Sequence, residues 1–393
     1  MRNGLRIVDM DTHVQPTVDV LEKYVEPSFR PRLSEFDPFR RTRQNYLGST
    51  TTLAVGPIPY DRMPGEAPRE EDTKATPGGR GGNEGRSHSM HRVPVQPQVQ
   101  DENVEGRLQD MDLEGRDIDF LFPGTSITSI TGLPDVTLSE GYYRAFHHYM
   151  NMYSSPAPDR LKSAIQVPGA DPEWAVSEIK MWGNEKWVAG VWVHLKEGLP
   201  VDHPDLEPIW ATMNEYDLPS VHHSFYMEPP YFPGYKDVWG NAVAARTFAH
   251  PWGASRLFAY MILGGLLDRY PNFRAFASEV GHGWLPNMLL RLGFNKSYLQ
   301  GASKDLKYTP LEYAQMGRIA CAAEPFEGPI MTKATIDVLG EDCLMHQSDY
   351  PHGQCWFPET AQEVMDWDFW PSLGPDALPK HMAGNAEKML RLN

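Results

Sequence analysis

Four short stretches of the sequence carry side chains suited to binding a metal ion. The first, RIVDMDTHVQP, holds Asp9, Asp11 and His13 at alternate positions. Because side chains alternate between the two faces of a β-strand, we expect these three to share one face and the residues between them the other. An aspartate and a histidine two residues apart at the end of a strand reach the same ion. We therefore expect Asp11 and His13 to bind it, and Asp9, one step deeper, to be structural.

Two further stretches add histidines and an acid. LPSVHHSF contains His222 and His223 side by side. Adjacent residues of a strand point to opposite faces, so only one of the two is expected to face a shared site. FASEVGHGWLP contains Glu279 and His282 next to glycines, which allow the backbone to approach closely.

The fourth stretch, HQSDYPHG, contains Asp349 and, three residues later, His352. Asp349 has no obvious cationic partner nearby in the sequence, and an unpaired acid is costly in an apolar interior. Four such stretches in one chain favour a common metal centre. Nitrogen and oxygen ligands without thiolates suit zinc, manganese or iron.

Each of these stretches ends a predicted strand, and the strands alternate with predicted helices. That order is typical of parallel strands joined by right-handed crossovers. The eight predicted strands are LRIVDMDTHV, DIDFLF, LKSAIQVPG, VAGVWVHL, LPSVHHSF, FRAFASEVG, GRIACAAEP and DCLMHQSDYPHG. Eight such units predict an α/β fold, a (β/α)8 barrel of the TIM type that forms a single domain over residues 1–393. The four ligand-bearing stretches follow strands one, five, six and eight, whose C-terminal ends meet at one mouth.

One region breaks the pattern. Residues 40–105 are polar and rich in proline, glycine and charge, as in EAPREEDTKATPGGRGGNEGRSHS, and show no sustained period. Composition alone is compatible with a flexible surface loop. The alternative is a long insertion after the first strand that covers the mouth of the barrel or contacts a partner subunit.

Composition narrows the class of protein. The 393 residues carry 36 basic and 52 acidic side chains, a net charge of −16, which argues against nucleic acid and anionic membranes as partners. An acidic substrate would need local cations or a metal. The three cysteines include no CxxC pair, which indicates reduced thiols in a cytoplasmic protein. No apolar leader or membrane span is expected.

The sequence resembles a known family at several points. The segments VDMDTHVQP, LPSVHH, GGLLDRYPNFRAFASEVGHGWLPNMLLRL, SDYPH and GNAEKMLRL are similar to the amidohydrolase superfamily. The branch is the one that contains aminocarboxymuconate-semialdehyde decarboxylase and the resorcylate-type decarboxylases. The resemblance covers most of the chain except the polar insertion. It implies a barrel enzyme that acts on a small organic carboxylate, by decarboxylation or hydrolysis, at a divalent zinc or manganese ion.

The resemblance also implies roles for individual residues. The first-strand ligand pair matches Asp11 and His13, and the eighth-strand aspartate matches Asp349. Counting from LP without gaps places the fifth-strand ligand on His223, whereas one deletion places it on His222.

Decarboxylases of this branch carry a catalytic histidine after the sixth strand. Glu279 or His282 falls near that place, and the two remain candidates for catalysis and for metal binding. Asp349 would be a ligand and proton acceptor and His282 an acid or base. His352 and Trp284 would contact the substrate. The set holds more ligands than one ion needs.

Some relatives in this superfamily hold two metals, iron with iron or manganese, and hydroxylate C–H bonds with dioxygen. The subunits of 2-aminoisobutyrate hydroxylase are such relatives, and the run HHSFYMEPPYFPGY together with the long insertion resembles them. The alternative function is therefore a dinuclear oxygenase that hydroxylates a small amino acid or acid, or an inactive partner subunit of one. In either case the resemblance implies a homo-oligomer or a hetero-oligomer with a related subunit.

Overall fold

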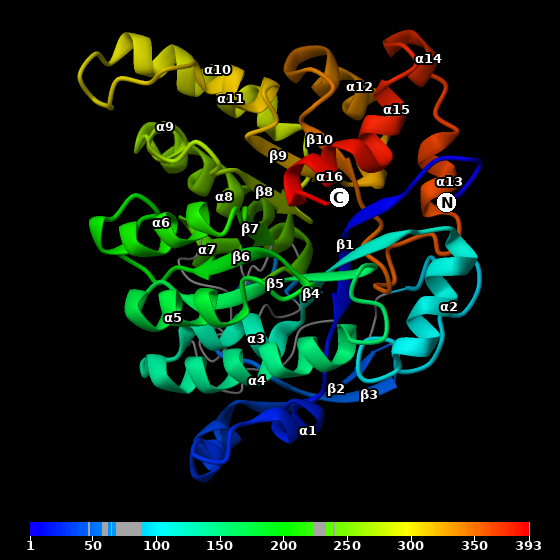
Figure 1. Cartoon of the computed structure of the whole chain (residues 1–393), viewed down its shortest axis with the longest axis vertical. Coiled ribbons are helices and arrows are strands. Elements are labelled where there is room, and N and C mark those ends of the chain that lie inside the picture. Colours follow the sequence, from blue (N-terminus) through cyan, green and yellow to red (C-terminus); the bar gives the residue numbers. More distant parts are fainter. Residues whose placement is uncertain are drawn as a thin grey trace.

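The computed structural model describes residues 1–45, 48–56, 62–63, 65–67, 88–223, 233–238 and 240–392. Its centre is an eight-stranded parallel sheet rolled into a barrel, as the sequence predicted (Figure 1). In spatial order the strands are β1 (Val8–Val14), β4 (Ile118–Pro123), β5 (Leu161–Pro168), β6 (Val188–His194), β7 (Ser220–His223), β8 (Ala275–Ser278), β9 (Ile319–Ala323) and β10 (Leu344–His346). Spatial order follows chain order, so the crossovers form a single ring.

Helices surround the strands. The longer ones are α2 (Val104–Glu114), α4 (Val136–Ser154), α5 (Pro172–Trp182), α6 (Glu207–Glu215), α8 (Ala242–Leu263), α10 (Trp284–Tyr298) and α12 (Gly328–Leu339). Shorter ones are α1 (Val18–Leu21), α3 (Thr125–Thr128), α7 (Tyr235–Val238), α9 (Leu266–Arg269), α11 (Pro310–Gln315), α13 (Thr360–Met365), α14 (Trp370–Leu373), α15 (Ala377–Pro379) and α16 (Asn385–Leu390). A π-helix, η8 (Lys380–Gly384), precedes α16. In the part of the chain that the structure describes, no helix combines the length and the apolar character needed to cross a membrane.

Local sequence explains where these helices begin. In α5 the Asp171 carboxylate accepts a hydrogen bond from the Trp174 N–H at 2.9 Å, and Pro172 occupies the first turn. Proline fits there because the first N–H groups of a helix have no partner inside it. In α8 the Asn241 side chain accepts hydrogen bonds from two backbone N–H groups at 3.1 and 3.2 Å. This cap fixes the point at which α8 leaves the mouth of the barrel.

The barrel interior is apolar along most of its length. Val8 and Met10 of β1 pack there with Phe120 and Phe122 of β4 and with Trp192 of β6, all of them buried. Asp9, between Val8 and Met10, is not part of this apolar cluster. Burying this interior removes a large apolar area from water, which is the main force that closes the barrel.

The barrel has a seam where β10 meets β1. The two strands are joined by a bridge between Thr12 and Tyr350 rather than by an extended ladder. The His13 N–H donates to the Tyr350 carbonyl at 2.7 Å, and the Asp349 N–H donates to the Asp11 carbonyl at 2.8 Å. The seam therefore brings the end of β1 against the segment after β10.

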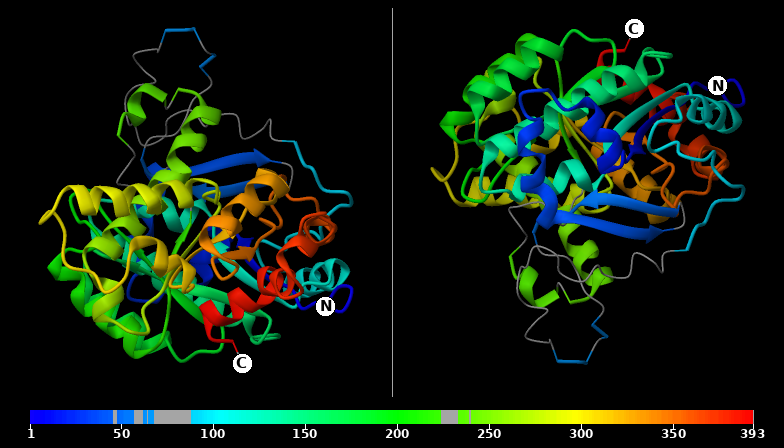
Figure 2. Two further views of the ribbon diagram at one scale, coloured as in Figure 1. Left: turned by 90° about the horizontal axis from the view of Figure 1, so that it is seen from above. Right: turned by 90° about the horizontal axis from the view of Figure 1, so that it is seen from below.

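The predicted insertion contains regular structure at its start. The strands β2 (Arg40–Asn45) and β3 (Gly48–Leu53) pair as an antiparallel hairpin, on the same side of the molecule as α7 (Figure 2). These strands form although the sequence of residues 40–105 shows no sustained period. Thr42, Thr51 and their neighbours favour a pleated strand, but the segment is too polar to show apolar alternation.

Part of the insertion crosses the loop after β10. The Met90 N–H donates to the Gly353 carbonyl at 2.5 Å, and the Arg92 N–H donates to the Phe357 carbonyl at 2.8 Å. These bonds hold residues 88–100 against the loop that carries Asp349 and His352. This part of the insertion therefore lies beside the loop that follows β10.

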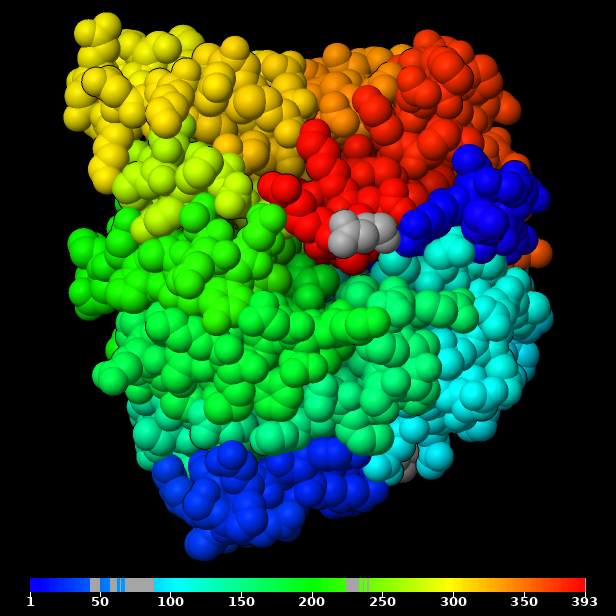
Figure 3. Space-filling view, in the orientation of Figure 1, coloured from blue at the N-terminus to red at the C-terminus, as the bar shows by residue number. Residues whose placement is uncertain are grey.

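The C-terminal segment packs beside the first residues of the chain (Figure 3). The Arg2 guanidinium donates to the Gln362 side chain at 2.9 Å and to the Pro358 carbonyl at 2.7 Å. Arg6 pairs with Glu387 at 3.0 Å. These contacts tie the first residues of the chain to its last helices.

Candidate metal centre

The end of β1 supplies two residues of the centre. The pairing of β1 with β4 shifts register between Asp9 and Thr12. Asp11 lies within this bulge and His13 just after it; both reach the mouth, and the His13 Nε2 atom lies 3.2 Å from Asp11 Oδ1. A β-bulge inserts one extra residue and changes which face the following side chains occupy.

The strict alternation predicted for the first strand is therefore wrong. Asp9 does not share a face with the other two: its carboxylate accepts hydrogen bonds from the Ser348 N–H at 2.9 Å and the Ser348 hydroxyl at 2.5 Å. Arg116 lies 3.6 Å from the same carboxylate. The structural role predicted for Asp9 agrees with these contacts.

His223, at the end of β7, faces the same site. Its Nε2 atom lies 3.2 Å from Asp11 Oδ1 and 3.3 Å from Glu279 Oε2. Phe122 and Trp192 flank its ring, with centroids 4.5 and 6.0 Å away, so the floor of the site is apolar. An apolar floor strengthens electrostatic interactions at the mouth.

His222 points the other way, towards α8. A side chain added at Gly253 of α8 would come within 2.7 Å of its Nε2 atom. Burial, with the nearby Arg256 guanidinium, holds the pKa of His222 well below its usual value. Of the two histidines that the sequence left open, His223 is thus the one that converges with the other candidate ligands.

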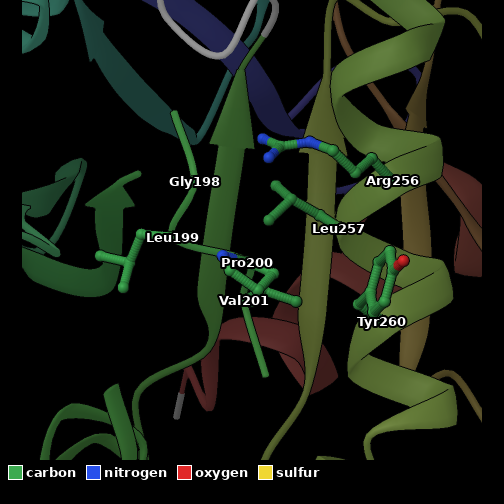
Figure 4. Close-up of a pocket in the computed structure, with 7 residues that line it drawn as sticks. All are labelled: Gly198, Leu199, Pro200, Val201, Arg256, Leu257 and Tyr260. Carbon is green, nitrogen blue, oxygen red and sulfur yellow. The ribbon is translucent and has the colours of Figure 1, made fainter. Parts of the chain in front are cut away.

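Arg256 also lines a separate pocket of about 220 Å³ between α8 and residues 198–201 (Figure 4). Leu257 and Tyr260 complete the wall on the α8 side. No local pattern in the sequence predicts this pocket, because its walls come from two distant segments.

Glu279 and Asp349 complete the group. Both have left-handed backbone conformations, with φ of +51° and +65°. Non-glycine residues hold such conformations at a cost, and they cluster at functional sites. Asp349 Oδ1 lies 3.0 Å from His13 Nε2, which brings the β10 acid against the β1 histidine.

His352 joins the site through Asp349. Its Nδ1 atom lies 2.7 Å from Asp349 Oδ1, and its Nε2 atom lies 2.8 Å from the Gln15 side-chain amide nitrogen. The carboxylate accepts a hydrogen bond from the Nδ1–H group, which orients the ring. The ring of His352 also stacks on that of His13 at 4.0 Å.

The electrostatics of the cluster favour a cation. Burial alone would lower the pKa of His13, but Asp11 and Asp349 beside it raise the pKa to about 10. Burial opposes ionisation of Asp349, yet His352 and His13 hold the pKa of its carboxyl far below the usual range. The site therefore stabilises the ionised form of the Asp349 carboxyl, and its negative charge attracts a cation.

A metal ion fits the donor atoms present. Two overlapping groups have ligand atoms within 4.8 Å of one another: Asp11, His13 and His223, and His13, Glu279, Asp349 and His352. Within the described part of the chain, the buried atoms Asp11 Oδ2 and Asp349 Oδ2 accept no hydrogen bond. Buried acceptors without a partner require an explanation, and a bound cation supplies one.

The remaining predicted residues lie beside the cluster. His282 is not among the converging groups: its Nδ1 atom lies 3.0 Å from Glu327 Oε2 and its Nε2 atom 3.1 Å from the Thr332 hydroxyl. Trp284 donates its ring N–H to the Val280 carbonyl at 2.8 Å. The roles of His282 as an acid or base and of Trp284 as a substrate contact remain predictions.

Sequence reasoning missed three residues near the cluster. Gln15 lies two residues after His13, so strand alternation was a usable signal for it. Glu324, at the end of β9, is buried, and its burial with the neighbouring acids raises the pKa of its carboxyl well above the usual value. Arg246 of α8 pairs with Glu279 at 2.6 Å, and nothing in its local sequence indicates that contact.

Comparison with known proteins identifies the family. A family model described as amidohydrolase matches residues 110–392. The chain therefore belongs to the amidohydrolase family, in agreement with the resemblance in the sequence. No curated protein matches the sequence.

Solved structures share the fold at low sequence identity. The 5-carboxyvanillate decarboxylase of Sphingomonas paucimobilis has a TM-score of 0.66 and 19% identity, over 99% of this chain and 100% of that one. The corresponding enzyme of Novosphingobium aromaticivorans, solved with manganese and 4-hydroxy-3-methoxy-5-nitrobenzoic acid, has a TM-score of 0.65 and 17% identity, over 100% and 97%. A Rhizobium 2,6-dihydroxybenzoate decarboxylase gives 0.63 and 17%, over 99% of each chain.

Proposed function

We propose that this protein is a metal-dependent enzyme that removes carbon dioxide from a small organic carboxylate at the mouth of the barrel. The observation that carries the proposal is the convergence of buried carboxylates and imidazoles from β1, β7, β8 and β10 on one point. The decarboxylases that share the fold support the choice of reaction, and hydrolysis of a small carboxylate is the alternative at the same site.

The ligands proposed for one divalent ion, zinc or manganese, are Asp11, His13, His223 and Asp349, with Glu279 as a further ligand. A divalent ion at this position polarises the oxygen atoms of a bound carboxylate and stabilises negative charge that develops on the substrate. Because the buried group includes two carboxylates, it offsets the charge of such an ion. The apolar floor formed by Phe122 excludes water beneath it.

The protein side of the reaction requires a group that exchanges a proton. His352 is placed for this role because Asp349 accepts a hydrogen bond from its Nδ1–H and orients the ring, so that Nε2, beside Gln15, is the atom that would carry the exchanged proton. A decarboxylation leaves a carbon that must be protonated, and an oriented imidazole is a common donor. His282 is a second candidate acid, supported by Glu327.

Metal analysis and a direct assay test this proposal. Protein purified without chelators is expected to hold about one zinc or manganese ion per chain, and to release carbon dioxide from one member of a panel of hydroxybenzoates. Chelation should abolish release, and the same ion should restore it. Metal-free protein that does not bind either ion under these conditions would contradict the proposal.

One observation favours a second candidate, the dinuclear oxygenase. The two ligand groups share only His13, so a second ion can be held by Glu279, Asp349 and His352. Two metals per chain including iron, with consumption of dioxygen, would support this reading and exclude simple decarboxylation. Most of the run HHSFYMEPPYFPGY, which suggested the oxygenases, lies outside the described residues.

We also propose a cytoplasmic location and an oligomer of identical or related subunits. Cys321, Cys343 and Cys355 are all free and buried, as expected for reduced thiols. Cell fractionation and light scattering of the purified protein test the two statements. A secreted protein or a monomer at micromolar concentration would contradict them.

A further inference from the structure

We propose that Arg246 binds the carboxylate group of the substrate, and that it takes this carboxylate in exchange for Glu279 when the cluster holds a metal ion. The inference rests on the proposed function, because it assumes a metal and a carboxylate substrate at this mouth. It assigns the residue that recognises the substrate's charge.

The position of Arg246 follows from α8. The Asn241 cap fixes the start of the helix, and the Arg246 side chain in its second turn reaches Glu279. His250 lies four residues later, on the same face of the helix, and its ring lies beside the backbone of Glu279. One helix face thus contacts Glu279 at both its side chain and its backbone.

Glu279 has two competing partners. Its Oε1 atom lies 2.6 Å from Arg246 Nη2, while its Oε2 atom lies 3.3 Å from His223 Nε2. The same carboxylate belongs to the ligand group that includes His13 and Asp349. A metal ion bound by Glu279 draws charge from this carboxylate, which weakens its attraction for the guanidinium.

Arg246 is suited to a second carboxylate. Its planar guanidinium accepts a carboxylate in a two-point contact, and its side chain is 46% exposed. By contrast, Arg107 and Arg116 are fully buried and paired with Asp119. Among the described residues, Arg246 is the arginine that forms an ion pair with the ligand group.

The negative charge of the mouth favours a cationic residue where an anionic substrate binds. The mouth contains Asp11, Glu279, Glu324 and Asp349, and the whole chain carries a net charge of −16. An anionic substrate approaching this field is repelled unless a local cation offsets it. The ion offsets part of the charge, and Arg246 supplies a cation at the rim.

The test compares wild type with Arg246→Met in two titrations. The first adds Mn²⁺ to metal-free protein, and the second adds 4-hydroxy-3-methoxy-5-nitrobenzoate to the Mn²⁺-loaded protein. We expect Arg246→Met to bind Mn²⁺ several-fold more tightly, because Glu279 is no longer shared, and to bind the probe roughly 10- to 100-fold more weakly. Arg246→Lys should fall between them, since it keeps the charge but not the two-point contact.

Arg269→Met is the matched control. Arg269 makes a two-point pair with Glu207, at 2.9 and 3.0 Å, on an outer surface, so both affinities should equal those of wild type. Tighter Mn²⁺ binding together with weaker probe binding by Arg246→Met supports the proposal. Unchanged or weaker Mn²⁺ binding by Arg246→Met, or unchanged probe binding, overturns it.

If the wild-type protein does not bind this probe, a second measurement tests whether Arg246 is released from Glu279. Phenylglyoxal modifies accessible arginines, and peptide mass spectrometry reports the rate at Arg246. Addition of Mn²⁺ should raise that rate several-fold, because Glu279 turns to the ion. An unchanged rate in protein that binds Mn²⁺ overturns the inference, whereas wild-type protein that does not bind Mn²⁺ overturns the proposed function itself.

Discussion

Adjacent residues of this protein have opposite surroundings. His223 lies against Asp11 and Glu279, while His222 faces Gly253 and Arg256 of α8. The difference arises because consecutive side chains of β7 point inward and outward in turn. His222 can therefore serve as the control when the role of His223 in metal binding is tested.

We expect His223→Ala to lose metal and His222→Ala to retain it. Loss of a residue that merely supports a ligand costs about 10- to 100-fold in metal affinity, and loss of a ligand should cost at least as much. Titration of metal-free protein with Mn²⁺, followed by calorimetry, measures the effect. Equal affinities for the two variants would contradict the ligand assignment.

The end of β8 turns sharply through Gly281, whose φ is +68°. A side chain here would lie 2.3 Å from Glu327 Oε1, and the other oxygen of Glu327 accepts hydrogen bonds from the N–H groups of His282 and Gly283 at 3.0 and 2.9 Å. This turn therefore links β8, α10 and α12.

We expect Gly281→Ala to destabilise the fold more than Gly301→Ala. Gly301 also has a positive φ, of +84°, but no atom lies within 4 Å of an added side chain. The control should lose about 1 kcal/mol through backbone strain, and Gly281→Ala about 1–3 kcal/mol more through the displaced Glu327 bonds. Urea unfolding measures both. Equal losses would show that Glu327 moves without cost.

The contact between β10 and the π-helix η8 makes stability depend on pH. His346 of β10 is buried near His381 of η8, with ring centroids 6.4 Å apart. Burial, with a smaller contribution from Arg116, lowers the pKa of His346 to about 3. The unfolded chain therefore binds a proton below pH 6.5 that the folded protein does not bind until about pH 3.

Because the unfolded state binds more protons in this window, stability falls as the pH decreases from 6.5 towards 3. One such histidine contributes at most about 1.4 kcal/mol per pH unit. We expect His346→Leu to show a shallower acid limb in urea unfolding measured from pH 7 to pH 5. A profile parallel to that of wild type would contradict this account.

At the scale of the whole molecule, the candidate ligands come from four strands spread around the barrel. A metal that binds only the folded state stabilises it by about 2.7 kcal/mol at a concentration 100 times its Kd. We expect EDTA to lower the melting temperature and Mn²⁺ to restore it in a concentration-dependent way. In calorimetry, His13→Ala should show no shift with Mn²⁺; a shift equal to that of wild type would place the ion elsewhere.

The sequence predicted the barrel because the apolar pattern within each segment is enough to identify it as a strand or a helix. The alternation of these segments then indicates the fold. The sequence also predicted most of the candidate ligands, since they end four of the predicted strands. The sequence did not predict the bulge in β1 or the contact of Arg246 with Glu279. Both depend on how distant segments meet, and local patterns carry no information about such contacts.

The seam between β1 and β10 has a consequence for biosynthesis. Asp11 and His13 belong to β1 and are synthesised before the strands β4 to β10, whereas Asp349 follows β10. The nascent protein therefore cannot assemble this group of ligands until almost all of the strands have been made. A metal ion that needs all of these ligands therefore binds only after β10 and the residues that follow it have been made.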